Sequence, residues 1–288
     1  MTDLDKQKIA DNFGHAAVAY HAQATLQKQS AAHLLNLAEP WLTHLPDGSI
    51  LEVGCGTGFI TQQLIQRFEG RSLTITDLSA AMLEFCQTHV QVPTSQRSLL
   101  SFQQLDGELL TAIPSQDASQ DASQDGRSQD AMPRYAMPSY AMIISGFAIQ
   151  WFKQPVETIH RWLNLLQPGG VLLVSVPTRD SFPEWRHACQ ALNLPYTAHP
   201  LPQAARLMQP LASEHFTATW YTEMLPTTFT SAADFFKSLK AIGASHSQTQ
   251  TRLSLPQMKQ LIRYWDAQNP AGVTVHHHVV FGIIQRAT

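Results

Sequence analysis

The sequence predicts an α/β fold with a doubly wound, mostly parallel sheet of seven strands, the last of them antiparallel. Short apolar runs typical of buried strands alternate with amphipathic runs typical of helices over residues 49–177. A glycine-rich turn, LEVGCGTGF at residues 51–59, joins the first strand to the next helix. A long alternating run, VTVHHHVVFGIIQRA at residues 273–287, indicates a strand that closes the sheet.

The first half of the chain follows this alternation closely. Residues 5–38 are rich in Ala, Gln and Leu and are predicted to be helical, with Ile9, Phe13 and Tyr20 on one face. Ser79 is expected to cap a helix by accepting from the amide three residues on. Strands are predicted at 49–54, 72–79, 99–106, 140–147 and 171–177, and helices at 60–68, 80–90 and 154–170.

After residue 178 the pattern predicts a helical insertion followed by a closing pair of strands. Helices are expected at 178–194, 231–245 and 255–268, and strands at 215–225 and 273–287. Residues 114–139 differ from the rest, because they repeat short units such as SQDA and lack branched aliphatic side chains. Such a segment is expected to be a disordered low-complexity loop.

The composition of the chain limits the classes of partner that it is expected to bind. The chain has 288 residues, a net charge of −3 and 44% hydrophobic residues, so no overall basic field attracts nucleic acid or a membrane. The three cysteines lack C-x-x-C spacing, which favours a reducing compartment. No apolar leader and no apolar run of membrane-spanning length is visible. We therefore expect a cytoplasmic protein, monomeric, with no nucleic-acid or membrane partner.

The glycine loop excludes two common phosphate ligands. A dinucleotide fingerprint, G-x-G-x-x-G, would need a third glycine at Phe59 or Thr61. A phosphate-binding loop of the G-x-x-x-x-G-K type would need a lysine, and none occurs between Lys28 and Lys153. The bare backbone at the start of a helix therefore suits another ligand.

Three acids accompany three consecutive predicted strands: Glu52 before the glycines, Asp77 and Asp106 at the strand ends. Asp77 lies about where an acidic side chain meets ribose hydroxyls in nucleotide-binding sheets. Together the acids suit a ligand with hydroxyls, amines and positive charge. S-adenosylmethionine has a ribose diol, an adenine amine, an ammonium and a sulfonium, and we expect it as the co-substrate, with no metal.

The sequence resembles the BioC-type malonyl-[acyl-carrier protein] O-methyltransferases of biotin synthesis, within the class I S-adenosylmethionine-dependent methyltransferases. The resemblance covers most of the chain outside 114–139. It rests on KQKIADNFGHAAVAYHAQATLQKQSAAHLL, LEVGCGTGF, DLSAAML, SGFAIQW, LQPGGVLLVSVP, FFKSLKAIGASH and VFGIIQRA. One departure is Ser145-Gly146, where this family often has Ser-Asn.

The resemblance implies a single methyltransferase domain. It would comprise an N-terminal helical cap (1–45), a donor-binding core (46–178), a substrate and lid region (179–272) and a closing strand (273–288). Gly54, Gly56 and Gly58 would line the donor, Asp77 would bind its ribose, and Asp106 with Gly107 its adenine. The expected donor-binding set is Glu52, Gly54, Gly56, Gly58, Asp77, Leu78, Asp106, Gly107 and Ser145.

The implied reaction methylates the free carboxylate of malonyl-acyl carrier protein or malonyl-CoA, the first step of pimeloyl-moiety synthesis. A carboxylate has a pKa near ~4 and needs no general base. Substrate-orienting candidates are Tyr20, Trp151, Lys237 and Lys240, with His246 and His278 as further hydrogen-bonding groups. Each also has an ordinary explanation, as a packed aromatic or a solvated helix face. A docking surface for an acidic carrier would contain Lys237, Lys240, Arg252, Lys259 and Arg263.

Two alternatives to this reaction remain open, and a metal site is not one of them. The histidines at 276–278 invite a metal site, but only two of them share a strand face, so no metal is expected. The acceptor could instead be a free small carboxylic acid or a quinone-type carbon. A catalytically silent protein that keeps the donor pocket as a binding or scaffold module would carry the same glycines and acids.

Overall fold

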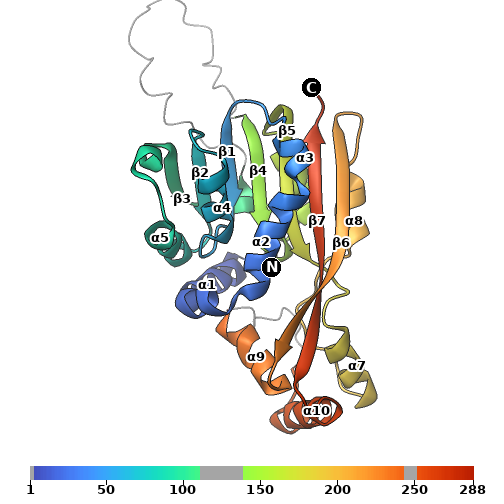
Figure 1. The fold of residues 1–288 in the computed structure, drawn as a ribbon. Helices are drawn as coiled ribbons and strands as arrows, with labels where there is room; N and C mark the ends of the chain where they lie inside the picture. Colours follow the sequence, from blue (N-terminus) through green and yellow to red (C-terminus); the bar gives the residue numbers. More distant parts are fainter. Residues whose placement is uncertain (1–2, 111–138, 243–251) are drawn as a thin grey trace, which may run out of the picture.

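The computed structural model describes residues 3–110, 139–242 and 252–288. Their centre is one seven-stranded sheet in the order β3-β2-β1-β4-β5-β7-β6 (Figure 1). The first five strands pair in parallel, and β7 is antiparallel to both β5 and β6, which confirms the predicted sheet. The strands are β1 (Ser49–Val53), β2 (Leu73–Asp77), β3 (Leu100–Gln104), β4 (Tyr140–Gly146), β5 (Leu166–Pro177), β6 (Phe216–Phe229) and β7 (Val273–Arg286).

Helices cover both faces of the sheet, as expected for a doubly wound fold. One face packs against α2 (Thr25–Leu37), α4 (Phe59–Arg67) and α5 (Ala80–His89) through a large hydrophobic cluster. The other packs against α6 (Pro155–Leu163) and α8 (Ala204–Met208), a short helix that the sequence did not predict. The predicted cap on α5 is confirmed, because the Ser79 hydroxyl accepts from the Met82 amide.

A third apolar cluster forms where the β6–β7 hairpin extends beyond the other strands. There α7 (Pro183–Ala191), α9 (Ala232–Ala241) and α10 (Leu255–Gln268) gather around the far end of the hairpin (Figure 1). Phe235 and Trp265 contact each other edge to face in this cluster, which also buries Val275 of β7. The helical insertion thus has a core of its own beside the sheet.

The N-terminal segment is helical, as predicted, and is divided at Ala24 into α1 (Asp3–Gln23) and α2. Whereas α2 packs on the sheet, α1 lies near the carboxyl ends of the central strands and contacts α5 and α9 (Figure 1). A short helix, α3 (Glu39–Leu42), follows. Residues 114–138 of the predicted low-complexity loop lie outside the described residues, as does His246.

One predicted helix is too long. The sequence predicted a helix over residues 154–170 that ends at Pro-Gly-Gly, but α6 ends at Leu163 and β5 begins at Leu166. The Pro-Gly-Gly segment instead forms an irregularity within β5, where the register against β4 shifts between Tyr140 and Met142. A Cβ on Gly170 would lie 2.8 Å from the Gln167 carbonyl oxygen, so glycine permits this close backbone approach.

Candidate active site

The glycine loop turns the chain from β1 into α4. Gly54 and Gly56 have φ angles of +78° and +53°, which side chains of L-residues rarely adopt. A Cβ on Gly54 would lie 2.6 Å from the Ala148 Cβ, so a side chain there would collide with the loop after β4. The Gly54 and Cys55 amides both donate to the Thr76 carbonyl at 2.9 Å, which ties the loop to β2.

Asp77 ends β2 and fixes two loops at once. One carboxylate oxygen accepts from the Gly56 amide and the other from the Ser79 amide, both at 2.8 Å. Burial raises the pKa of Asp77, although these backbone hydrogen bonds act in the opposite direction. The carboxylate is therefore held in one orientation at the edge where the glycine loop is bare.

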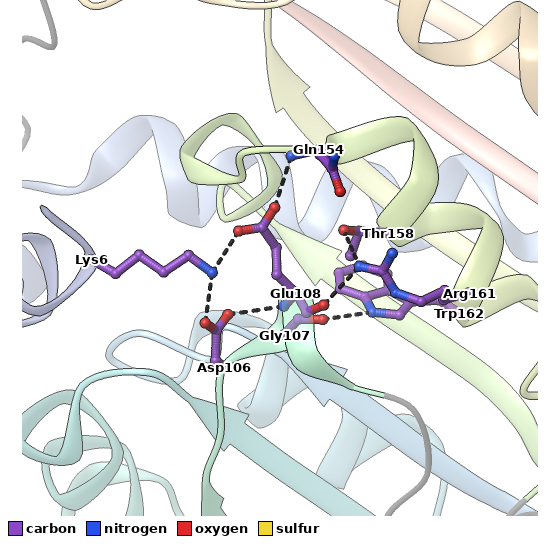
Figure 2. Close-up of polar contacts among 8 residues, drawn as sticks. All are labelled: Lys6, Asp106, Gly107, Glu108, Gln154, Thr158, Arg161 and Trp162. Carbon is purple, nitrogen blue, oxygen red and sulfur yellow. Dashed lines mark hydrogen bonds and ion pairs between the residues drawn. The ribbon is translucent and has the colours of Figure 1, made fainter. Parts of the chain in front are cut away.

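Asp106 lies two residues after β3 and meets a lysine from the N-terminal helix (Figure 2). The Lys6 ammonium is 2.6 Å from an Asp106 oxygen and 2.5 Å from a Glu108 oxygen. Burial alone would lower the pKa of Lys6, but its hydrogen bonds to the two carboxylates outweigh this and raise it. The Glu108 carboxylate accepts in turn from the backbone amide of Gln154, and the Glu108 backbone carbonyl accepts from Arg161 (Figure 2).

The glycine loop, Asp77, Asp106 and Lys6 line a cavity of about 110 Å³ at the carboxyl ends of β1, β2 and β4, which we call the donor pocket. The sheet side contributes six of the predicted residues: Gly54, Gly56, Asp77, Leu78, Asp106 and Gly107. The opposite wall comes from α1, through Lys6, Ile9, Ala10 and Phe13. The structure thus brings most of the predicted donor-binding set together.

Three predicted donor-binding residues are not in that wall. Glu52 is 1% exposed beneath the loop, where it accepts from the Thr61 hydroxyl at 2.7 Å. Ser145 is fully buried and donates to the Val53 carbonyl, which ties β4 to β1. Gly58 is the N-cap of α4 and faces Val90 and Cys86. Their positions indicate support of the loop rather than direct contact with a ligand.

Glu52 gives a testable pH dependence of stability. Burial raises its pKa to about 8 from an ordinary value of 4.5, although the Thr61 hydrogen bond opposes the change. The folded state then holds a proton that the unfolded state releases, so Glu52 lowers the unfolding free energy as pH rises from 4.5 to 8. The slope is about 1.4 kcal/mol per pH unit.

We expect Glu52→Gln to remove this contribution. Urea denaturation at several pH values should show a flatter stability profile for the variant than for the wild type between pH 5.5 and 8. Asp77, whose pKa is also raised, is present in both proteins and cancels in the comparison. If the unfolding free energies of the wild type and Glu52→Gln changed equally with pH, Glu52 would be ionised in the folded protein over this range.

A larger cavity of about 600 Å³, which we call the acceptor cavity, adjoins the donor pocket. Four aromatic residues line both spaces: Phe13, Tyr20, Phe147 and Trp151. Phe13 meets Trp151 edge-on with ring centroids 5.6 Å apart, and Phe147 has a φ of +56°, unusual for a bulky residue. We call these four residues the aromatic window, because they form the wall that the two spaces share.

Tyr20 has an unusual place in the aromatic window. Its ring lies 3.9 Å from where a Cβ of Gly56 would be. Burial, followed by the negative charge of Asp77, raises the pKa of Tyr20 well above its ordinary value. Its hydroxyl therefore stays protonated at neutral pH and can donate a hydrogen bond, but it cannot serve as a base.

The acceptor cavity is mostly aromatic and aliphatic, with Lys240 and Arg252 in its wall. Lys240 was a predicted substrate-orienting residue, and the structure places it beside this cavity. Lys237 instead points to solvent, where it pairs with Asp234 at 3.0 Å. His278 contacts the Thr178 hydroxyl at 2.5 Å and is absent from the wall, whereas its neighbour His277 contributes to it.

The histidine run of β7 is divided among separate partners. His276 pairs with Glu184 at the start of α7, and His277 packs edge-on against Phe182. Burial lowers the pKa of His277 to about 4, so its ring is neutral. Over residues 3–110, 139–242 and 252–288, no three metal-ligating side chains converge on one point.

Sequence reasoning missed Lys6 and Phe147. Lys6 had a usable signal, because residues 6, 9, 10 and 13 follow the spacing of one helix face and Ile9 and Phe13 were already placed there. Phe147 had none, since its backbone conformation depends on the loop after β4. The Ser145-Gly146 departure also has a local reason: a Cβ on Gly146 would lie 2.6 Å from Ile60.

A family model described as a methyltransferase domain matches residues 22–277. The chain belongs to this methyltransferase family. The match begins within α1 and extends into β7, so it includes the glycine loop, the acids and the helical insertion.

Relatives of this methyltransferase match it along nearly its whole length. A protein of Magnetococcus marinus named malonyl-[acyl-carrier protein] O-methyltransferase is 28% identical, over 97% of this chain and 93% of its own. One of the same name from Priestia megaterium is 29% identical, over 96% of both chains. The biotin biosynthesis bifunctional protein BioCD of Bordetella avium is 26% identical, over 97% of this chain and 52% of its own.

Solved structures agree in fold with this methyltransferase. A methyltransferase structure from Bacillus halodurans superposes with a TM-score of 0.55 at 12% identity, covering 90% of this chain and all of that one. The magnesium protoporphyrin IX methyltransferase of Synechocystis, solved with bound SAH, gives 0.50 at 14% identity, over 90% and 83%. Among the helices of the described ranges, none has the length and apolar character needed to cross a membrane.

Proposed function

We propose that this methyltransferase transfers the methyl group of S-adenosylmethionine to the free carboxylate of malonyl-acyl carrier protein. The product would be the malonyl methyl ester that starts pimeloyl synthesis for biotin. The observation that carries the proposal is the junction of two unlike cavities. A pocket with fixed carboxylates and a bare glycine loop shares the aromatic window with a larger, mainly apolar cavity whose wall carries two cations.

The donor pocket fits the proposed co-substrate group by group. Asp77 offers the remaining lone pairs of its oxygens to the ribose diol, since each oxygen already accepts one backbone amide. Asp106 and Gly107 would meet the adenine edge. The absence of a side chain at Gly54 and Gly56 leaves the backbone open to the methionine portion.

The acceptor cavity suits an anion on an apolar chain. Aliphatic and aromatic walls remove water from a carboxylate, which strengthens its attraction to any cation that remains within reach. Lys240 and Arg252 are the cations of this wall in the described part of the chain, and no acidic side chain of that part contributes to it. We propose that they orient the malonyl thioester so that its free carboxylate faces the aromatic window.

The chemistry requires alignment and no proton transfer. A carboxylate oxygen forms a bond to the methyl carbon while the carbon–sulfur bond breaks, and its electron pair stays on sulfur. Holding the two reactants in line can supply about 7–11 kcal/mol of the barrier. The protonated Tyr20 hydroxyl can hydrogen-bond the carboxylate oxygen that does not react, which leaves the attacking oxygen bare.

Docking of an acidic carrier protein would use the exposed cations of α9 and α10, of which Lys240 also lines the acceptor cavity. Lys259 and Arg263 are exposed on α10, one turn apart, and α10 packs against α9, which carries Lys237 and Lys240. We call these four residues the basic surface. An interface of this kind is expected to be small and electrostatic, with less than about 1,200 Å² buried.

The basic surface predicts that carrier binding weakens with salt. We expect the KM for malonyl-acyl carrier protein to rise severalfold from about 50 mM to about 500 mM NaCl, because exposed charges are screened. Lys259→Glu should raise this KM about threefold to tenfold and leave the KM for malonyl-CoA unchanged. Arg97→Glu, an exposed cation near β3, is the matched control. If Lys259→Glu and Arg97→Glu raised the KM for malonyl-acyl carrier protein equally, α10 would not be part of the docking site.

The reaction itself is tested with a panel of acceptors. Purified protein is incubated with methyl-labelled S-adenosylmethionine and, separately, malonyl-acyl carrier protein, malonyl-CoA, free malonate or a quinone. We expect the labelled methyl group on the malonyl thioesters. Mild base should release this label, as it does from a methyl ester. Label on free acid or quinone alone would contradict the proposed acceptor. Donor binding without transfer to any acceptor would favour a silent binding protein.

A further inference from the structure

Lys6 contacts two acids at the donor pocket. Lys6 itself belongs neither to the glycine loop nor to the acids at the strand ends that were expected to bind the donor. Lys6 is 8% exposed, and its ammonium lies between Asp106 and Glu108, whose side chains are also largely buried (Figure 2). Asp106 accepts from Lys6 on one oxygen and from the Glu108 amide on the other. Both oxygens of the acid proposed to hold adenine are thus fixed, and each keeps a free lone pair.

The same contact fastens one wall of the donor pocket. Ile9, Ala10 and Phe13 follow Lys6 on the face of α1 that lines the pocket opposite the sheet. A ligand in this pocket therefore lies between α1 and the strand ends. Any ligand too large to leave past the other walls can be released only when α1 moves away, and that movement breaks the buried ion pairs of Lys6.

We propose that Lys6 is a positioning residue of the donor site: it orients Asp106 toward the adenine amine and holds α1 over the bound nucleoside. This inference rests on the proposed function, because it takes the donor pocket as the site of S-adenosylmethionine. The ligand class that depends on Lys6 is an adenine nucleoside with an exocyclic amine. Lys6 does not touch the reacting atoms.

The test compares binding of S-adenosylhomocysteine, the product form of the donor, by calorimetry and by stopped-flow release. Lys6→Met keeps an unbranched side chain that is only one atom shorter and removes the charge. We expect at least about a tenfold weaker affinity, equivalent to losing one charge-assisted hydrogen bond, mainly through faster release. Lys8→Met is the matched control, because Lys8 lies exposed on the same helix.

Lys6→Met also leaves two buried carboxylates without a cation, so the variant will be less stable. The double variant Lys6→Met/Glu108→Gln separates this effect from positioning. It removes one of the two charges, and its melting temperature should recover toward that of the wild type. We expect its affinity for S-adenosylhomocysteine to stay at least about tenfold below that of Lys8→Met.

The outcomes are distinct. Recovery of donor affinity together with stability in the double variant would show that Lys6 only neutralises buried charge, and would overturn the proposal. Equal affinity of Lys6→Met and Lys8→Met would overturn it as well. If the wild type and Lys8→Met both fail to bind S-adenosylhomocysteine, the proposed function falls, and the role of Lys6 falls with it.

Discussion

Asp77→Ala is expected to weaken binding of S-adenosylmethionine by at least about 100-fold, because it removes the charged acceptor that we propose for two hydrogen bonds from the ribose diol. The same change frees the Gly56 and Ser79 amides, which are fixed at 2.8 Å by the two carboxylate oxygens. The glycine loop then loses its tie to the end of β2. Both effects weaken the same site, which makes this the largest binding defect that we predict.

Calorimetry with S-adenosylhomocysteine measures this effect without an acceptor. Asp77→Asn keeps one carbonyl oxygen and the shape of the side chain, so its loss should be smaller than that of Asp77→Ala. Glu84→Ala is the matched control, because Glu84 is an exposed acid on α5, just beyond the same turn. If Asp77→Ala bound the ligand as tightly as Glu84→Ala, Asp77 would not be the ribose ligand.

Tyr20→Ala is expected to reduce the rate of methyl transfer about 100-fold when both substrates are saturating. Its ring is part of the aromatic window, and its removal would join the donor pocket and the acceptor cavity into one space. Water could then reach the carboxylate, and the reacting atoms would lose their alignment. A misplacement of about 1 Å can reduce the rate about 100-fold.

Single-turnover kinetics separates the parts of this effect. Tyr20→Phe keeps the wall and removes only the hydroxyl, so we expect a smaller loss of rate, about tenfold, which corresponds to one hydrogen bond to a charged acceptor. Tyr221→Ala is the matched control, because Tyr221 is 42% exposed on β6. Equal rates for Tyr20→Ala and Tyr221→Ala would remove the aromatic window from the mechanism.

The parts of the fold set by local sequence were predictable. The turn from β1 through the glycine loop into α4 and the cap at Ser79 each depend on a few neighbouring residues, and both were confirmed. Pro168-Gly169-Gly170 was misread because the same residues end a helix or allow an irregular strand. Only the pairing of β5 with β4, distant in sequence, decides between the two.

The site was predictable where residues follow strand ends, and less so where their direction matters. Asp77 and Asp106 were expected at one edge because parallel strands end together. Glu52 and Ser145 lie in strands that are buried on both faces, so their alternation carries no signal for which side they face. The helix-face spacing of α1 placed Lys6 beside Ile9 and Phe13, but its two acidic partners depend on how α1 packs on the sheet, which that spacing does not specify.

The most direct test of the central claim is a crystal structure with S-adenosylhomocysteine and a non-hydrolysable malonyl thioester analogue. The ribose is predicted to meet Asp77, the adenine amine Asp106, and the sulfur the aromatic window, with the malonyl carboxylate facing it from the acceptor cavity. A nucleoside found elsewhere, or seated with its sulfur turned away from that cavity, would contradict the account.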